Sequence, residues 1–461
     1  MNLINLSIVD VRHGLQTKQF SSAEYVSALI EEAGRRSALN CFVNLDTARL
    51  LREARLFDDQ PKAGPLAGIP IAFKDNIDVR GVATTAGTRK LRANFAAKHA
   101  PVASKLFDAG ALFFGKLSMH ELALGITSNN GWLGPCRHPL DLGLSPGGSS
   151  GGNSAALAAG LVPGAIGTDT GGSIRLPAAL CGVVGLRPTA GRYPQAGIVP
   201  ISHTRDTAGP MARCVEDVAL LDAVVTGDHA HEAVELSGLR LGLLRHATWE
   251  RLERDVQKVC EEALDVLRKA GVILVEVTVE NLEPLNAAIG FPVVLYELIR
   301  DLPAYLRSRG SALTIQSVID EIRSPDVAQI MRLAMDNPVP ETAYADALTA
   351  RLKLKEAYRQ CFRAHRLDAI ILPTSPMTAR PIGADETVEL EGEQVPTFAT
   401  FIRHTDYASN AGLPGISLPA GLVEAGLPVG LELDGPEGSD RRLLAIAAAI
   451  ERVMPSVRLA P

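Results

Sequence analysis

Residues 144–188 constrain the fold more than any other part of this 461-residue chain. Two clusters rich in glycine and serine, GGSSGG and TGGS, flank the apolar segment AALAAGLVPGAIG. A disordered Gly/Ser linker contains no such apolar run. The pattern therefore predicts a loop, a buried helix, a short strand and a second tight loop. A serine set among free backbone N–H groups is also the arrangement that acyl transfer needs.

Composition and charge exclude several classes of protein. The net charge is −6 and no basic stripe stands out, which argues against nucleic-acid and membrane-surface partners. The six cysteines are scattered without a CxxC pair, so neither a zinc site nor a disulfide framework is expected. The first residues lack the features of a signal peptide, and no run of about 18 uninterrupted apolar residues predicts a membrane span. We expect a cytoplasmic protein with reduced thiols.

Strand and helix patterns alternate along the chain and predict an α/β fold. Its centre is expected to be a single large, mixed and mostly parallel β-sheet sandwiched between helices. The expected strands cover residues 69–74, 111–117, 237–244, 272–277, 368–374, 415–420 and 429–433. The expected helices cover residues 3–37, 45–57, 101–110, 214–225, 249–270 and 440–453. Residues 191–213 are rich in proline and glycine and are expected to be irregular.

Lys74 comes near the end of the apolar strand expected at residues 69–74. An isolated lysine is ordinarily solvated, but an apolar strand puts this one at risk of burial. Burial lowers the pKa of a lysine and makes it a candidate base. Asp75 follows directly, so its side chain should point to the opposite face of the sheet.

Residues 147–151 match the G-x-S-x-G elbow of α/β-hydrolases, but their context does not. An elbow needs a strand before the serine and a helix after it, with an acid and then a histidine later in the chain. The preceding segment RHPLDLGLSP has prolines and no β pattern, and none of the later histidines lies in a fitting context. The context of these residues therefore does not support a Ser–His–acid elbow.

Three segments together closely resemble the amidase signature family of serine hydrolases. They are GIPIAFKDN, SPGGSSGGNSAALAAG and GTDTGGSIRLPAALCGVVGLRPT. The spacing agrees with the family: Lys74 precedes Ser149 by 75 positions, and Ser149 precedes Ser173 by 24. The resemblance extends over residues 20–225 and, more loosely, to GLPGISLPAGL and LPVGLEL near the C-terminus.

The resemblance implies a Ser–cisSer–Lys triad and the amidase signature fold. Ser173 matches the nucleophile, Ser149 the bridging serine and Lys74 the base. The peptide bond between Gly148 and Ser149 would be cis. The oxyanion hole would be formed by the backbone N–H groups of Thr170, Gly171, Gly172 and Ser173. A serine hydroxyl needs a base, and a neutral lysine can act through a second hydroxyl, so no metal or organic cofactor is required.

Two neighbouring features bear on this assignment. Ser150 is the rival for the relay role, and only the family spacing favours Ser149. Asp169 and Arg175 flank the TGGS loop, and we expect them to form a buried ion pair that holds its shape, because charges are rarely buried unpaired.

The resemblance also implies domains, substrates and partners. We expect one domain over residues 1–461, with a signature core at 66–225 and a helical cap at 281–400 that sets specificity. HELALGITSNN and residues 191–213 look most like the bacterial arylacetamide hydrolases, which cleave indole-3-acetamide or mandelamide. By analogy, Gly125, Ile126 and Thr127 approach the acyl side of the substrate. Aromatic residues within 296–305 and 398–407 are candidates for a pocket wall.

The implied function is hydrolysis of a small aryl or arylacetamide-type amide, through a Ser173 acyl-enzyme, to an acid and ammonia or an amine. Anilides, esters and carbamates are alternative substrates. A glutaminase subunit of a tRNA-dependent amidotransferase is a second alternative, although ITSNN stands here where such subunits have SSTENS. A non-catalytic binding relative is a third. The expected partner is a small-molecule amide, with a homodimer as the assembly to test.

Overall fold

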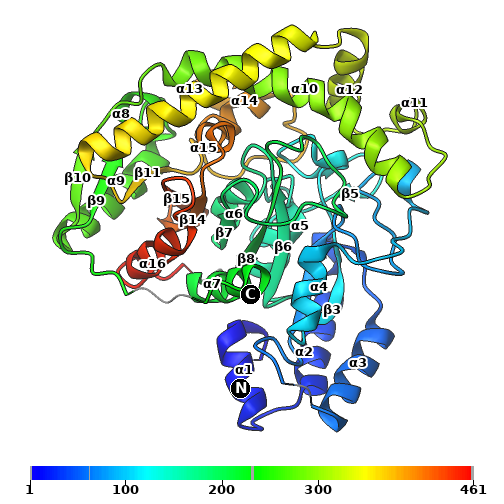
Figure 1. Ribbon diagram of the computed structural model, residues 1–461. Coiled ribbons are helices and arrows are strands. Elements are labelled where there is room, and N and C mark those ends of the chain that lie inside the picture. The colour runs from blue at the N-terminus through cyan, green and yellow to red at the C-terminus, as the bar shows by residue number, and fades with distance from the viewer. Residues whose placement is uncertain (1–2, 62, 230–232, 458–461) are drawn as a thin grey trace.

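The computed structural model describes residues 3–61, 63–229 and 233–457, and the outer ends of the expected 1–461 domain lie outside them. An eleven-stranded mixed sheet forms the centre (Figure 1). Its strand order is β1 (Phe42–Asn44), β3 (Leu112–Leu117), β2 (Pro70–Lys74), β6 (Gly164–Asp169), β8 (Thr207–Ala212), β7 (Val184–Arg187), β14 (Gly415–Leu422), β15 (Pro428–Asp434), β11 (Ala369–Pro373), β9 (Arg240–Leu243) and β10 (Ile273–Glu276).

The expected mixed sheet between helices is confirmed, and its parallel pairs lie in two separate groups. Strands β3, β2 and β6 form one parallel group, and β11, β9 and β10 form the other. Between β6 and β11 every pairing is antiparallel. This antiparallel centre is larger than expected from the sequence, which predicted a mostly parallel sheet. The strand β8 falls within residues 191–213, which we expected to be irregular, and β14 returns directly as the hairpin strand β15.

Helices cover both faces of the sheet. On one face, α7 (Val215–Thr226), α9 (Arg254–Lys269) and α16 (Asp440–Glu451) contact β8, β14 and β15. On the other face, α5 (Gly151–Ala158) contacts β6 and β2, and α6 (Arg175–Cys181) contacts β7, β14 and β15. The remaining helices of the first half are α1 (Ile8–Gln16), α2 (Ser22–Arg35), α3 (Thr47–Asp59) and α4 (Pro101–Asp108). The buried helix expected after the first serine cluster is therefore α5.

The short helix α5 can pack close to neighbouring backbone because its first turn contains glycine. A Cβ atom at Gly152 would lie 2.4 Å from the carbonyl oxygen of Ser118, which no larger residue could accept. Every residue from 151 to 157 is buried. Two loops, one before α5 and one between β6 and α6, are thereby held against the same region of the sheet.

A helical layer lies over this region, between residues 281 and 411. Its helices are α10 (Leu282–Ser308), α11 (Ile315–Ile319), α12 (Pro325–Asp336), α13 (Glu341–His365), α14 (Thr397–Ile402) and α15 (Thr405–Ala411); the short α8 (Arg245–Thr248) precedes α9. Figure 1 shows α10 and α13 arching over α14, α15 and α6. The layer also holds the hairpin of β12 (Thr387–Leu390) and β13 (Glu393–Pro396), so residues 281–400 are not wholly helical. A second small hairpin joins β4 (Asn129–Asn130) and β5 (Gly134–Pro135).

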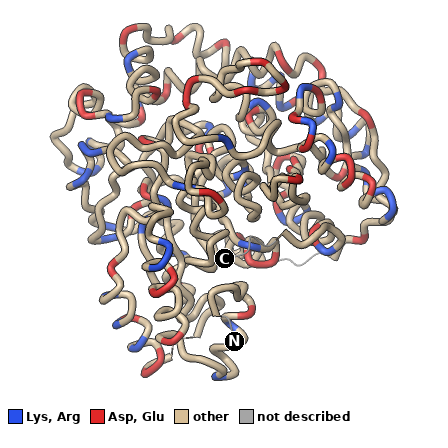
Figure 2. The backbone as a smooth tube through the Cα atoms, turned by 180° about the vertical axis from the view of Figure 1, so that it is seen from behind, with Lys and Arg blue, Asp and Glu red and all other residues tan. Residues whose placement is uncertain are grey.

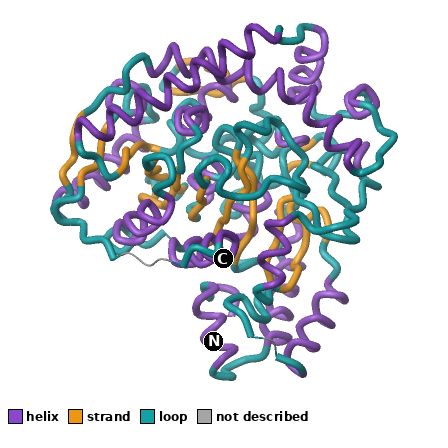
Figure 3. Tube along the Cα trace, viewed as in Figure 1, coloured by secondary structure: helices purple, strands orange, loops and turns teal. Residues whose placement is uncertain are grey.

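One helix departs from the expectation about membranes. Among the described residues, α10 is long and apolar enough to cross a bilayer by length and composition alone. In the structure α10 packs along α13 and α15. Figure 2 shows basic and acidic residues interspersed along the backbone, in agreement with the lack of a basic stripe in the sequence. Figure 3 shows loops filling the space between the central strands and the arch of α10, and the candidate site lies there.

Candidate active site

Lys74 ends β2 and is fully buried beneath the loops. Its Nζ lies 2.8 Å from Ser149 Oγ and 2.9 Å from Thr168 Oγ1. Asn76 also donates to Thr168 Oγ1, which fixes that hydroxyl. As the strand pattern predicts, Asp75 points elsewhere. Its carboxylate lies 3.0 Å from Nζ of Lys116, and both side chains are fully buried.

The environment of Lys74 makes its neutral form accessible near neutral pH. Burial lowers the pKa of Lys74 to about 7, although the charges of Asp169 and Asp206 partly oppose this shift. A neutral amine has one lone pair and two N–H groups. The carbonyl and the hydroxyl of Thr168 both lie within reach of those N–H groups, at 3.3 Å and 2.9 Å. The lone pair is then left for the Ser149 hydroxyl.

The two candidate relay serines have different partners. The Gly148–Ser149 peptide bond is cis, and Ser149 Oγ faces Lys74. The Ser150 hydroxyl instead donates to the carbonyl of Thr168 at 3.3 Å. Ser149 therefore contacts the lysine, whereas the Ser150 hydroxyl bonds a carbonyl. The residues alone could not decide between the two serines.

Ser173 lies on the loop between β6 and α6 and is 9 % exposed, on the wall of a cavity. Its carbonyl accepts the Ser150 N–H, which joins the two serine loops. In the described part of the chain, the N–H groups of Thr170, Gly171 and Ser173 have no acceptor. The N–H of Gly172, expected in the oxyanion hole, instead donates to Asp169 at 2.9 Å.

The expected ion pair beneath this loop is present and has a second arginine. Arg175 and Arg187 each lie 3.0 Å from the carboxylate of Asp169, and all three side chains are fully buried. Burial opposes ionisation of Asp169, but the two arginine charges outweigh it and hold its pKa far below the usual range. The carboxylate also accepts the N–H of Ile174, so it fixes both ends of the turn.

Two further contacts clamp the loop from outside, and the sequence did not reveal them. The hydroxyl of Thr405 donates to the carbonyl of Gly171 at 2.6 Å. Gly172 has φ +132°, and a Cβ there would lie 2.1 Å from Thr405 Oγ1, so glycine is required. The hydroxyl of Thr170 donates to Asp206 at 2.6 Å. These partners come from distant segments whose approach depends on tertiary packing.

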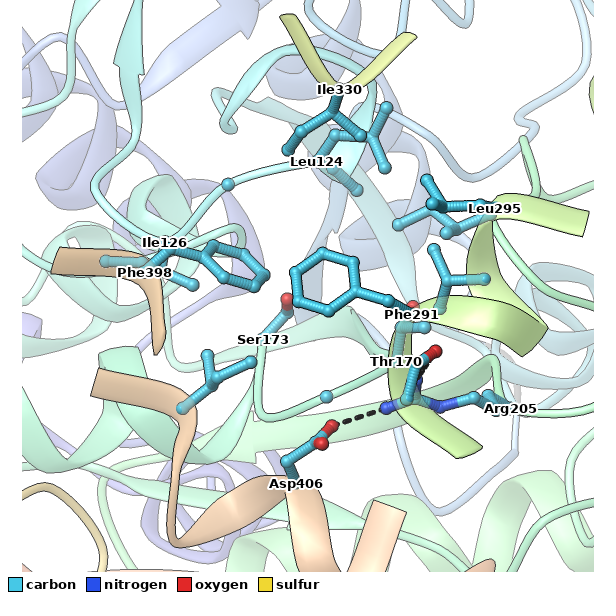
Figure 4. Close-up of a pocket in the computed structure, with 17 residues that line it drawn as sticks. Leu124, Ile126, Thr170, Ser173, Arg205, Phe291, Leu295, Ile330, Phe398 and Asp406 are labelled. Carbon is cyan, nitrogen blue, oxygen red and sulfur yellow. Dashed lines mark hydrogen bonds and ion pairs between the residues drawn. The ribbon is translucent and has the colours of Figure 1, made fainter. Parts of the chain in front are cut away.

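Ser173 opens onto a cavity of about 90 Å³, which we call the inner cavity because it contains the candidate nucleophile. Its apolar lining includes Leu124, Ile126, Phe291, Leu295, Ile330 and Phe398 (Figure 4). The charged residues in the lining are Arg205 and Asp406, which form an ion pair at 2.5 Å.

The three expected substrate contacts are spread over two hollows. Gly125 lines the inner cavity, and Ile126 lines both hollows. Thr127 lines an adjoining outer hollow of about 850 Å³, and its hydroxyl donates to Asp385 at 2.6 Å. Of the aromatic candidates, Phe398 lines the cavity, whereas Phe291 was not anticipated.

Among the described residues, one group has the spacing of metal ligands: His203, Glu297 and Asp301. The Glu297 carboxylate already accepts hydrogen bonds from the hydroxyls of Tyr344 and Thr204, at 2.6 and 2.9 Å. Asp301 accepts from the backbone and ring of His203. Protein donors therefore account for this group.

Comparison with known proteins identifies the family. The family model named Amidase matches residues 24–444, so the chain belongs to the amidase family. It is 45 % identical to an indoleacetamide hydrolase of Agrobacterium vitis over 97 % of each chain. It is 40 % identical to a mandelamide hydrolase of Pseudomonas putida, over 98 % of this chain and 92 % of the other. A solved amidase crystal structure superposes with a TM-score of 0.87 at 32 % identity, covering 98 % of this chain and 100 % of that one.

Proposed function

We propose that this amidase hydrolyses small arylacetamide-type amides to the acid and ammonia or an amine, through an acyl-enzyme on Ser173. The observation that carries the proposal is the buried contact between Lys74 and Ser149, 2.8 Å long, next to a serine that opens onto an apolar cavity. The indoleacetamide and mandelamide hydrolases among its relatives support the substrate class.

The proposed cycle uses one proton path in both directions. Neutral Lys74 accepts the proton of Ser149. The Ser173 hydroxyl, which makes no hydrogen bond among the described residues, turns toward Ser149 when the substrate binds and gives its proton to Ser149. Ser173 Oγ attacks the amide carbonyl, and the tetrahedral intermediate breaks its C–N bond as the proton returns to the leaving nitrogen. Water then attacks the ester and gives its proton to Lys74 through Ser149. The bond between the acyl carbon and Ser173 Oγ breaks, the proton returns to Ser173 Oγ by the same path, and the acid is released.

The free N–H groups on the loop are suited to the negative charge that develops on the carbonyl oxygen. Those of Thr170, Gly171 and Ser173 lack acceptors in the described residues, so they form the proposed oxyanion hole. One such donor typically contributes about 3–4 kcal/mol to the transition state. Gly172 acts indirectly, because its N–H holds the turn to Asp169.

The lining of the inner cavity favours an uncharged, apolar acyl group. Arg205 and Asp406 neutralise each other, and most other lining side chains are aliphatic or aromatic. An amino-acid substrate such as glutamine would place its charges against this apolar surface, which is unfavourable. We therefore prefer an aryl amide to the glutaminase alternative.

We further propose that different parts of the chain supply the catalytic residues and the substrate-binding residues. The core at residues 66–225 carries the triad, and residues 281–400 contribute Phe291, Leu295, Ile330 and Phe398 to the cavity. Cytoplasmic location and a homodimer stay predictions from the sequence.

A substrate panel tests the function. Purified enzyme is assayed for ammonia release from indole-3-acetamide, mandelamide, benzamide and glutamine, beside Ser173→Ala. We expect turnover of the aryl amides by the wild-type enzyme alone. Turnover of glutamine without turnover of any aryl amide would contradict the proposed substrate class.

A further inference from the structure

Two phenylalanine rings stand between the inner cavity and the outer hollow. Phe291 comes from α10 and Phe398 from α14, and their ring centroids are 6.2 Å apart with an interplanar angle of 47°. Both side chains line both hollows. Figure 4 shows the rings facing one another beside Ser173. Phe291 is 53 % exposed, which is unusual for so large an apolar side chain.

The sizes of the two hollows make this boundary important. Small-molecule sites usually enclose about 300–1,000 Å³. The inner cavity of about 90 Å³ is below that range, so an aryl acyl group can enter it only if the rings move and enlarge it, whereas the outer hollow of about 850 Å³ lies within the range. A substrate that reaches Ser173 must therefore displace the rings or extend between them.

The chemistry of the linings indicates which part of the substrate lies on each side. Ser173, Thr170 and Gly171 line the inner cavity, so the carbonyl must be placed there. The apolar inner lining suits the aryl acyl group. The amide nitrogen then faces the outer hollow, whose lining includes the polar side chains Asn129 and Gln329. A polar exit suits a departing ammonia or amine.

We propose that Phe291 and Phe398 form an aromatic gate that determines specificity by limiting the bulk of the nitrogen substituent. The gate holds the aryl acyl group on the inner side and admits the substituent into the outer hollow. This inference rests on the proposed chemistry at Ser173. The rings part to admit the aryl acyl group of every substrate. They can close again behind the NH₂ group of a primary amide, whereas an N-aryl substituent keeps them apart.

The gate can be altered without disturbing the core, because more than half of the Phe291 side chain is exposed. Phe95 offers a matched control. It is 63 % exposed and lines neither hollow. Phe291→Ala opens the gate, Phe291→Trp narrows it, and Phe95→Ala removes the same ring elsewhere.

The experiment compares kcat/KM for indole-3-acetamide and for its N-phenyl anilide, a neutral pair that differs at the nitrogen. We expect Phe291→Ala to raise the anilide-to-primary ratio by about tenfold or more, because steric discrimination of this kind is typically worth at least that factor. Phe291→Trp should lower the ratio, and Phe95→Ala should leave it unchanged.

The failures of the gate and of the function are distinguishable. Hydrolysis of both amides with the same ratio in all variants would overturn the gate and leave the amidase proposal intact. Failure of the wild-type enzyme to hydrolyse the primary amide would overturn the proposed function and, with it, the gate. Thermal melting of each variant checks that the fold is retained.

Discussion

The floor of the site differs sharply from its wall. The floor consists of Lys74, Ser149 and the loop 170–173. Lys74 and Ser149 are fully buried and hydrogen-bonded to each other, and the half-buried Thr170 is held by Asp206. The wall consists of the apolar lining side chains from α10, α12 and α14, and one of its rings is half exposed. Catalysis requires that the reacting side chains be held in fixed positions, whereas substrate preference depends on the shape of the cavity lining. We therefore expect floor variants to change kcat and wall variants to change KM or substrate preference.

The largest effect is expected at the nucleophile. Ser173→Ala should lower kcat for indole-3-acetamide by about 10⁴-fold or more, because removing a nucleophile disables the whole triad. The variant should melt at nearly the wild-type temperature, since the Ser173 hydroxyl makes no hydrogen bond within the described residues. Ammonia release measures the activity. If Ser173→Ala kept its activity to within tenfold of the wild-type enzyme, Ser173 could not be the nucleophile.

The next effect separates the two neighbouring serines. Ser149→Ala should lower kcat by about 10³-fold, the usual scale for general acid–base catalysis, because it breaks the path to Lys74. Ser150→Ala should lower kcat by less than about tenfold, because its hydroxyl bonds a backbone carbonyl instead. The same ammonia assay compares them. Equal losses of kcat in the two variants would contradict the assignment of the relay role to Ser149 alone.

A smaller effect concerns pH. Lys74 acts as a base in its neutral form, and burial lowers its pKa to about 7. Below that pH the amine is protonated, so kcat/KM should fall about tenfold for each further pH unit, and above it kcat/KM should level off. Initial rates between pH 5.5 and 9 measure this limb. A flat profile across pH 7 would contradict Lys74 as the titrating base.

The smallest effect is expected in the wall. Leu295→Ala should raise KM for indole-3-acetamide by about three- to tenfold, because it removes apolar contact made equally in the ground and transition states. Its kcat should stay near the wild-type value. Steady-state kinetics separates the two parameters. A fall in kcat without a change in KM would mean that the wall also shapes the reacting geometry.

The contrast between floor and wall also explains what the sequence could predict. Lys74, Ser149 and Ser173 lie in compact motifs at the end of β2, before α5 and after β6, so the resemblance could predict their positions and the roles that we propose for them. The buried pair of Asp169 and Arg175 is confirmed for a similar reason, since it spans one short loop.

Other features depend on packing between distant segments. Phe291, Asp206 and Thr405 reach the site only when α10, the segment before β8 and α15 close over it. The strand β8 was missed because its sequence, TAGPMA, is fully buried and shows neither alternation nor β-branched residues beyond one threonine. The direction of the Gly172 N–H depends on the position of the Asp169 carboxylate, which no motif encodes.

Covalent labelling tests the central claim, that Ser173 is the nucleophile, most directly. The wild-type enzyme is treated with a fluorophosphonate probe with and without excess indole-3-acetamide, and the modified peptide is identified by mass spectrometry. The account predicts one adduct, on Ser173, which the amide suppresses and which Lys74→Ala slows. An adduct on Ser149 or Ser150, or none in an enzyme that hydrolyses the amide, would contradict it.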